Sequence, residues 1–177
     1  MKRMRATIAL ALARPGQPAD QPGGGLAVAL LIVAFAVLTA PWLIGDLTIP
    51  YDAKAHFQTQ VQFLATALHN GQSPFWAPHV FAGTPQIADP QSLIFSPALL
   101  LAWLFPQPSF RLVDGYVFAM LLIGALAIFQ LARDKGWHPA GALTAALVFG
   151  FGSSAAWRVQ HIGQIVSLAM LALALCL

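Results

Sequence analysis

The stretch that decides the fold is LAVALLIVAFAVLTAPWLI, residues Leu26 to Ile44. It is apolar apart from Thr39 and Pro41, and a helix needs about 20 mostly apolar residues to cross a bilayer. Trp42 stands near its end, where aromatic side chains commonly anchor a span at the membrane interface. The stretch therefore predicts a transmembrane helix over residues 26–45.

Further apolar runs follow the same pattern and cover residues 112–132, 139–157 and 162–177. Counted with residues 26–45, these make four runs. The second run, residues 112–132, ends in the charged turn from Arg133 to Gly136. The third contains Gly150 and Gly152, which favour close helix packing within lipid. The fourth is still apolar at Leu177, so we expect it to be the start of a helix and the chain to be truncated. The runs predict an all-α, polytopic transmembrane protein.

Composition supports this class. Only 8% of the residues are charged, against roughly 25% in an average soluble domain. The chain has no Glu and no basic patch interleaved with aromatic residues, so nucleic acid is not an expected partner. The expected partner is the lipid bilayer. The one cysteine, Cys176, excludes an intrachain disulfide.

Charge near the amino terminus predicts the orientation. Four of the nine cations precede the first span, namely Lys2, Arg3, Arg5 and Arg14, and the positive-inside tendency places such charge in the cytoplasm. Residues 1–25 are thus predicted to be a cytoplasmic tail, and residues 46–111 an extracytoplasmic loop. In an alternative interpretation, basic residues 1–5 and the short apolar run 6–13 form a secretory signal.

The apolar run from Leu93 to Phe105 is too short to span and contains Pro97. We interpret it as interfacial or re-entrant. A span there would reverse the side of everything that follows, and counting Lys and Arg gives equal totals for the two topologies. Only the shortness of the run favours the first topology.

The long loop holds most of the polar chemistry, with three of the six carboxylates and three of the five histidines. Pro50 and Asp52 are typical of a helix start, and Asn70-Gly71 of a helix end. Apolar residues recur between them at helical spacing, which predicts an amphipathic helix on the membrane surface. Asp52 and His56 would share one stripe of this helix.

Each polar residue has a structural interpretation beside a functional one. Asp52 is either a helix cap or a catalytic or ligand residue. Asp89, which precedes Pro90, is either an ordinary turn residue or presents its carboxylate from a turn. Asp114 is expected at the interface or facing the bundle. Arg158 and His161 either meet an anionic headgroup or anchor their helix. The loop's carboxylates and histidines are scattered along the sequence, so no metal ligands are assigned, and a divalent cation is the one candidate cofactor.

Three motifs in order carry a family resemblance: Ser73-Pro-Phe-Trp-Ala-Pro78, Phe81-Ala-Gly-Thr-Pro85 and Ala88-Asp-Pro-Gln-Ser92. With Asp52 soon after the first span, the chain resembles the bacterial YfhO-like membrane proteins over roughly residues 41–175. It departs from them at Ala77, where the family commonly has Asn. Family members have many more spans, so the resemblance is to their amino-terminal portion.

That family is similar to the GT-C superfamily of glycosyltransferases, which take sugars from polyprenyl-phosphate carriers on the extracytoplasmic side. The resemblance implies a multi-pass protein of the bacterial inner membrane that transfers a sugar to an envelope acceptor. Asp52 matches the first-loop carboxylate that acts as base, and Asp89 is its expected partner in acceptor or metal binding. The substrate-binding residues predicted with them are His56, Gln91, Lys54, Arg158 and His161, with Lys54 or Arg158 beside the leaving phosphate. The 177-residue chain alone is expected to be inactive.

A second interpretation is a non-catalytic polytopic membrane protein, such as a lipid-carrier-binding subunit or a transporter component. Transporters place ionisable groups at mid-membrane, whereas this sequence places them near span ends. The chain has no Gly-rich phosphate loop, nucleophile elbow or paired-His motif.

Overall fold

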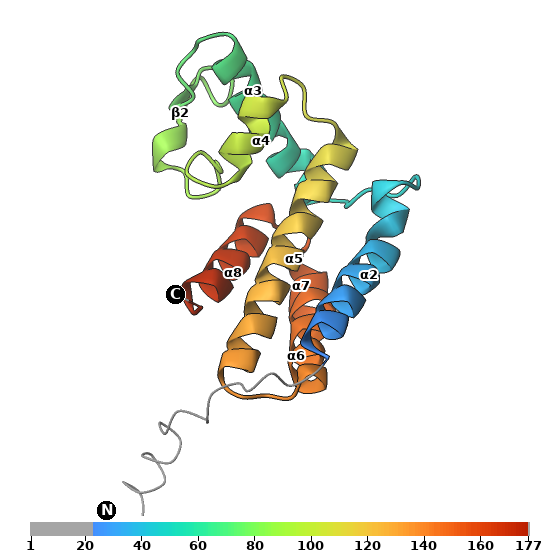
Figure 1. Cartoon of the computed structure of the whole chain (residues 1–177). Helices are drawn as coiled ribbons and strands as arrows, with labels where there is room; N and C mark the ends of the chain where they lie inside the picture. Colours follow the sequence, from blue (N-terminus) through green and yellow to red (C-terminus); the bar gives the residue numbers. More distant parts are fainter. Residues whose placement is uncertain (1–22, 177) are drawn as a thin grey trace, which may run out of the picture.

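A computed structural model describes residues 23–176 of the chain (Figure 1). The described part is mostly helical and has one small two-stranded sheet. The predicted tail, residues 1–25, and the alternative signal segment fall outside the described residues, apart from the last three residues of the tail.

Among residues 23–176, three helical stretches are long and apolar enough to cross a membrane: α2 (Gly24–Leu43), α5 (Phe110–Asp134) and Pro139–Arg158. The prediction of a mostly helical protein with helices long and apolar enough to cross a membrane is confirmed. The fourth apolar run forms α8 (Ile162–Ala174), which is shorter.

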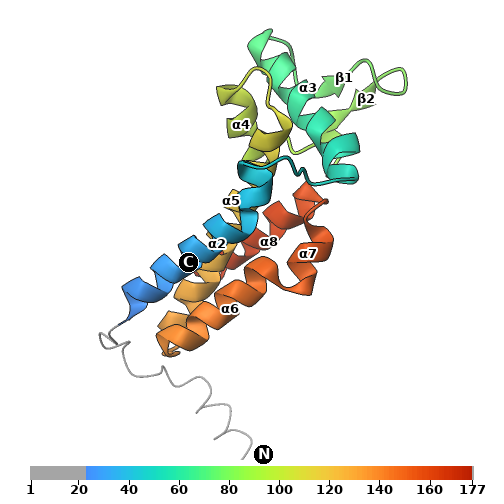
Figure 2. The ribbon, with the colours of Figure 1, turned by 90° about the vertical axis from the view of Figure 1, so that its right-hand side faces the viewer.

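Helix α5 lies at the centre of the bundle and packs against α2, α6 (Pro139–Phe151) and α8 (Figures 1 and 2). Its fully buried side chains include Val113, Val117 and Ala125. Its start is set by Ser109, whose hydroxyl oxygen accepts a hydrogen bond from Leu112 N at 3.2 Å and so satisfies a backbone donor that the first turn leaves unpaired.

The predicted third span is bent into α6 (Pro139–Phe151) and α7 (Ser153–Arg158). Gly152 causes the bend, because its backbone is extended at φ −64° and ψ 167°. A Cβ at Gly152 would overlap the carbonyl oxygen of Val148, so only glycine fits without a shift of the backbone.

The segment between α2 and α5 gathers at one end of the bundle, called here the loop end (Figure 1). It contains η1 (Ala53–Phe57), a turn of π-helix, followed by α3 (Gln58–His69), and Phe57, Val61 and Leu64 face the core. These two elements occupy the stretch where the amphipathic helix was predicted.

A short hairpin and a short helix complete the loop end. Strands β1 (Trp76–Ala77) and β2 (Thr84–Pro85) pair antiparallel, with Ala77 opposite Thr84, and η2 (Gln86–Ala88) follows. Helix α4 (Ala98–Leu104) has seven residues, lies against α3 and is too short to span. The loop end is thus a small folded layer above the helices.

Candidate functional site

The structure brings two predicted site residues together at the loop end. Asp52 precedes η1 and His161 precedes α8, and the distance from Asp52 Oδ2 to His161 Nε2 is 3.4 Å. The Asp52 side chain is 56% exposed and that of His161 is 33% exposed. The pair is therefore accessible to a ligand while the imidazole is partly enclosed.

Asp52 does not act as a helix cap in this fold. Although it occupies the N-cap position of η1, its backbone is helical, at φ −59° and ψ −28°, and its side chain makes no capping hydrogen bond. Tyr51 before it has φ +56°, a left-handed conformation that costs a non-glycine residue about 1 kcal/mol or more. Asp52 thus follows a strained turn and directs its carboxylate to His161.

His56 is on the next turn of the same segment. Its ring packs edge-on against Phe57, with centroids 4.9 Å apart, and its Nε2 is buried without a hydrogen-bond partner among the described residues. Nδ1 of His161 is also buried and unpartnered there. The Asp52 carboxylate thus pairs with His161. It forms no ion pair with His56, although the sequence predicts both residues on one stripe of the helix.

Lys54 and Asp114 form an ion pair that connects the loop segment to α5. Lys54 Nζ donates to Asp114 Oδ1 at 2.5 Å, and Asp114 Oδ2 accepts from Thr48 Oγ1 at 2.9 Å and from Ile49 N at 3.2 Å. Asp114 is 1% exposed and Lys54 16%. Lys54 Nζ also lies 5.1 Å from the centroid of the Phe110 ring. The ammonium group predicted to meet phosphate is thus largely enclosed by the protein.

The other predicted residues lie at the end of α7 and in the turn that contains Asp89 and Gln91. Arg158, at the end of α7, is exposed and its Nη1 donates to Gln164 Oε1 at 2.5 Å. Asp89 Oδ1 accepts from the backbone N of the exposed Gln91 at 2.8 Å, which makes an Asx turn. Asp89 lines a hollow of about 550 Å³ between residues 87–97 and α8.

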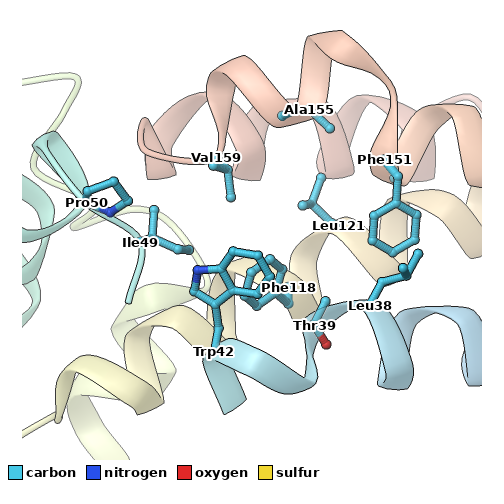
Figure 3. A pocket seen from close by; sticks show the side chains of 12 residues that line it. Leu38, Thr39, Trp42, Ile49, Pro50, Phe118, Leu121, Phe151, Ala155 and Val159 are labelled. Carbon is cyan, nitrogen blue, oxygen red and sulfur yellow. The ribbon is translucent and has the colours of Figure 1, made fainter. Parts of the chain in front are cut away.

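An apolar pocket of about 420 Å³ lies between α2, α5 and the bent α6–α7 helix (Figure 3). Trp42, Phe118 and Phe151 contribute aromatic rings to its wall. Pro50 and Val159 also line it, and each is two residues away along the chain from a member of the Asp52–His161 pair. The pocket therefore adjoins that pair at its loop end.

Sequence analysis missed this pocket. In the sequence, Gly152 marks the interruption between α6 and α7, and both of these helices line the pocket. For a metal, the described residues hold no group of three or more His, Cys, Asp or Glu side chains placed to bind one.

The chain has no significant match to a protein-family model, a curated protein or a solved structure.

Proposed function

We propose that the chain is the N-terminal part of a membrane glycosyltransferase that moves a sugar from a polyprenyl-phosphate carrier to an envelope acceptor on the extracytoplasmic side of the bacterial inner membrane. The observation that carries the proposal is the accessible Asp52–His161 pair, 3.4 Å apart, at the loop end of an apolar pocket. The loop motifs add a resemblance to the YfhO-like membrane proteins, a family that is similar to the GT-C glycosyltransferases.

The chemistry assigns a role to each group. The Asp52 carboxylate accepts the proton of the acceptor hydroxyl as the hydroxyl oxygen bonds to the anomeric carbon of the sugar. The bond from that carbon to the carrier phosphate oxygen breaks, and the phosphate leaves with the electron pair. Arg158, exposed three residues before His161, supplies positive charge where the leaving group becomes more negative. His161 orients the carboxylate.

The apolar pocket is suited to the polyprenyl chain of the sugar carrier. Ligand pockets span roughly 300–1,000 Å³ and are mostly apolar with a few polar groups, and a volume of about 420 Å³ lies in that range. Most of its wall is formed by hydrophobic residues of helices that are long and apolar enough to cross a membrane. A polyprenyl chain in the pocket would place its phosphate toward the loop end, beside the pair.

A non-catalytic role is the second candidate, and two observations favour it. The Asp89 carboxylate forms an Asx turn with Gln91, and Lys54 is held by Asp114, so both have structural partners. In this alternative the Asp52–His161 contact only fastens the loop to α8, and the protein binds a lipid carrier or supports a transporter.

Asp52→Asn distinguishes the two in cells whose only copy of the gene encodes the variant. General-base loss reduces rates by about 10²–10⁴-fold, so we expect loss of envelope-polymer glycosylation at normal membrane levels of the protein. Asp46→Asn is the matched control, because Asp46 is an exposed carboxylate in the same connection. Unchanged glycosylation in Asp52→Asn would refute the catalytic role and leave the non-catalytic alternative.

A further inference from the structure

Buried Asp114 has a geometry that suggests a function beyond stability. It lies in the second turn of α5, with 1% of its side chain exposed. Its two carboxylate oxygens receive three donors, all from one short segment: Thr48 Oγ1, Ile49 N and Lys54 Nζ. Hydrogen bonds to a charged acceptor are stronger than neutral ones.

The three donors bracket Asp52. Thr48 and Ile49 precede it and Lys54 follows it, so Asp114 holds the chain on both sides of the strained residue Tyr51. A left-handed backbone at a non-glycine residue persists only where surrounding contacts impose it. The bonds to Asp114 provide that constraint.

We infer that Asp114 and Lys54 are positioning residues, which fix the 48–54 segment so that the Asp52 carboxylate faces His161. Lys54 then serves to hold the base in place, and the contact with the leaving phosphate falls to Arg158. The inference rests on the proposed function only for what Asp52 does once it is positioned, and the geometric part can be tested without any substrate.

The test measures cross-linking between positions 52 and 161 in membranes. The variants Asp52→Cys and His161→Cys are combined in a Cys176→Ser background, which removes the only native cysteine, and a short reagent with two thiol-reactive maleimide groups joins the pair by alkylating both thiols. Ala77→Cys with Thr84→Cys, opposite each other in the hairpin, reports on whether the loop end stays folded. Asp134→Ala, at the far end of α5 and bonded to Gln130, is the matched control for Asp114→Ala.

We expect Asp114→Ala to lower the 52–161 cross-linking rate by about tenfold or more, because it removes all three hydrogen bonds, and the loss of even one bond to a charged group changes a local equilibrium by about tenfold. The 77–84 rate and the Asp134→Ala rates should stay at the level of the unsubstituted background. Lys54→Met should lower the 52–161 rate less, because Thr48 and Ile49 keep their acceptor. An unchanged 52–161 rate in Asp114→Ala would overturn the inference.

If Asp114→Ala lowers the 77–84 cross-linking rate as well, the loop end of that variant is not folded normally. The Lys54→Met variant then decides whether Asp114 and Lys54 are positioning residues. A selective loss of 52–161 cross-linking in that variant supports positioning, and an equal loss at both pairs or no loss overturns it. The proposed function fails separately, because unchanged glycosylation in Asp52→Asn would remove the catalytic role without altering these cross-linking rates.

Discussion

Gly150→Ala tests the packing that holds the pocket together. Gly150 lies in α6 under the ring of Phe35 from α2, and a Cβ at this position would come within 2.5 Å of Phe35 Cζ and 2.9 Å of Cε2. Carbon atoms pack best at about 3.5–4.0 Å, so the ring would have to retreat by about 1 Å. Phe35 is 3% exposed, and its ring centroid is 4.4 Å from that of Phe151, so it has little room to do so.

The expected free-energy change combines two terms of opposite sign. Overpacking of this kind costs about 1–3 kcal/mol, while replacing a helical glycine by alanine returns roughly 0.5–1 kcal/mol. The matched control is Gly141→Ala in the same helix, where a Cβ would lie 3.8 Å from Trp137, an ordinary contact. Gly141→Ala should therefore receive only the favourable term, and the two variants should differ by about 1–3 kcal/mol.

The assay is reversible unfolding in mixed micelles, followed by tryptophan fluorescence. We expect Gly150→Ala to be the less stable of the two variants, and its cost to shrink when Phe35→Leu removes the ring. Equal stabilities for Gly150→Ala and Gly141→Ala would refute the close approach of α2 to α6.

Three further outcomes are expected. Ser109→Ala removes the cap on Leu112 N and should lower unfolding stability in the same assay by about 1 kcal/mol; no change would contradict the cap. Gly83→Ala should disrupt the hairpin, because Gly83 has φ +117° and a Cβ would overlap the Trp76 ring, and faster proteolysis between β1 and β2 would report it; an unchanged cleavage rate would argue against this geometry. Val159→Trp should fill the pocket and raise the KM for a lipid-linked sugar more than it lowers kcat, whereas an unaltered KM would separate the pocket from donor binding.

The helices that are long and apolar enough to cross a membrane were predictable from the sequence because their signal is local. The length and hydropathy of a run such as Leu26 to Ile44 can be read from that run alone, and no other part of the chain is needed to interpret it. The bend at Gly152 was not predicted, since an apolar window does not distinguish a straight helix from one interrupted by a single extended glycine.

The candidate site was predictable only as separate residues. Asp52 and His161 were both named, but their contact depends on α8 returning to the loop end beside η1, which no local pattern encodes. The roles of Lys54 and Asp114 could not be predicted for the same reason, because their ion pair joins positions 60 residues apart. Conversely, the Asx turn at Asp89 is a local feature, and the Asp-Pro step favoured a turn there.

Direct sugar transfer tests the central claim most closely. Membranes from cells producing the gene's full product, as wild type, Asp52→Asn or Asp46→Asn, would be given a polyprenyl-phosphate donor with a labelled sugar. The measured quantity is the rate at which label enters the acceptor and free polyprenyl phosphate appears. We predict equal rates for wild type and Asp46→Asn and a rate lower by about 10²-fold or more for Asp52→Asn. Transfer by Asp52→Asn at the wild-type rate, or no transfer by the wild type, would contradict the account.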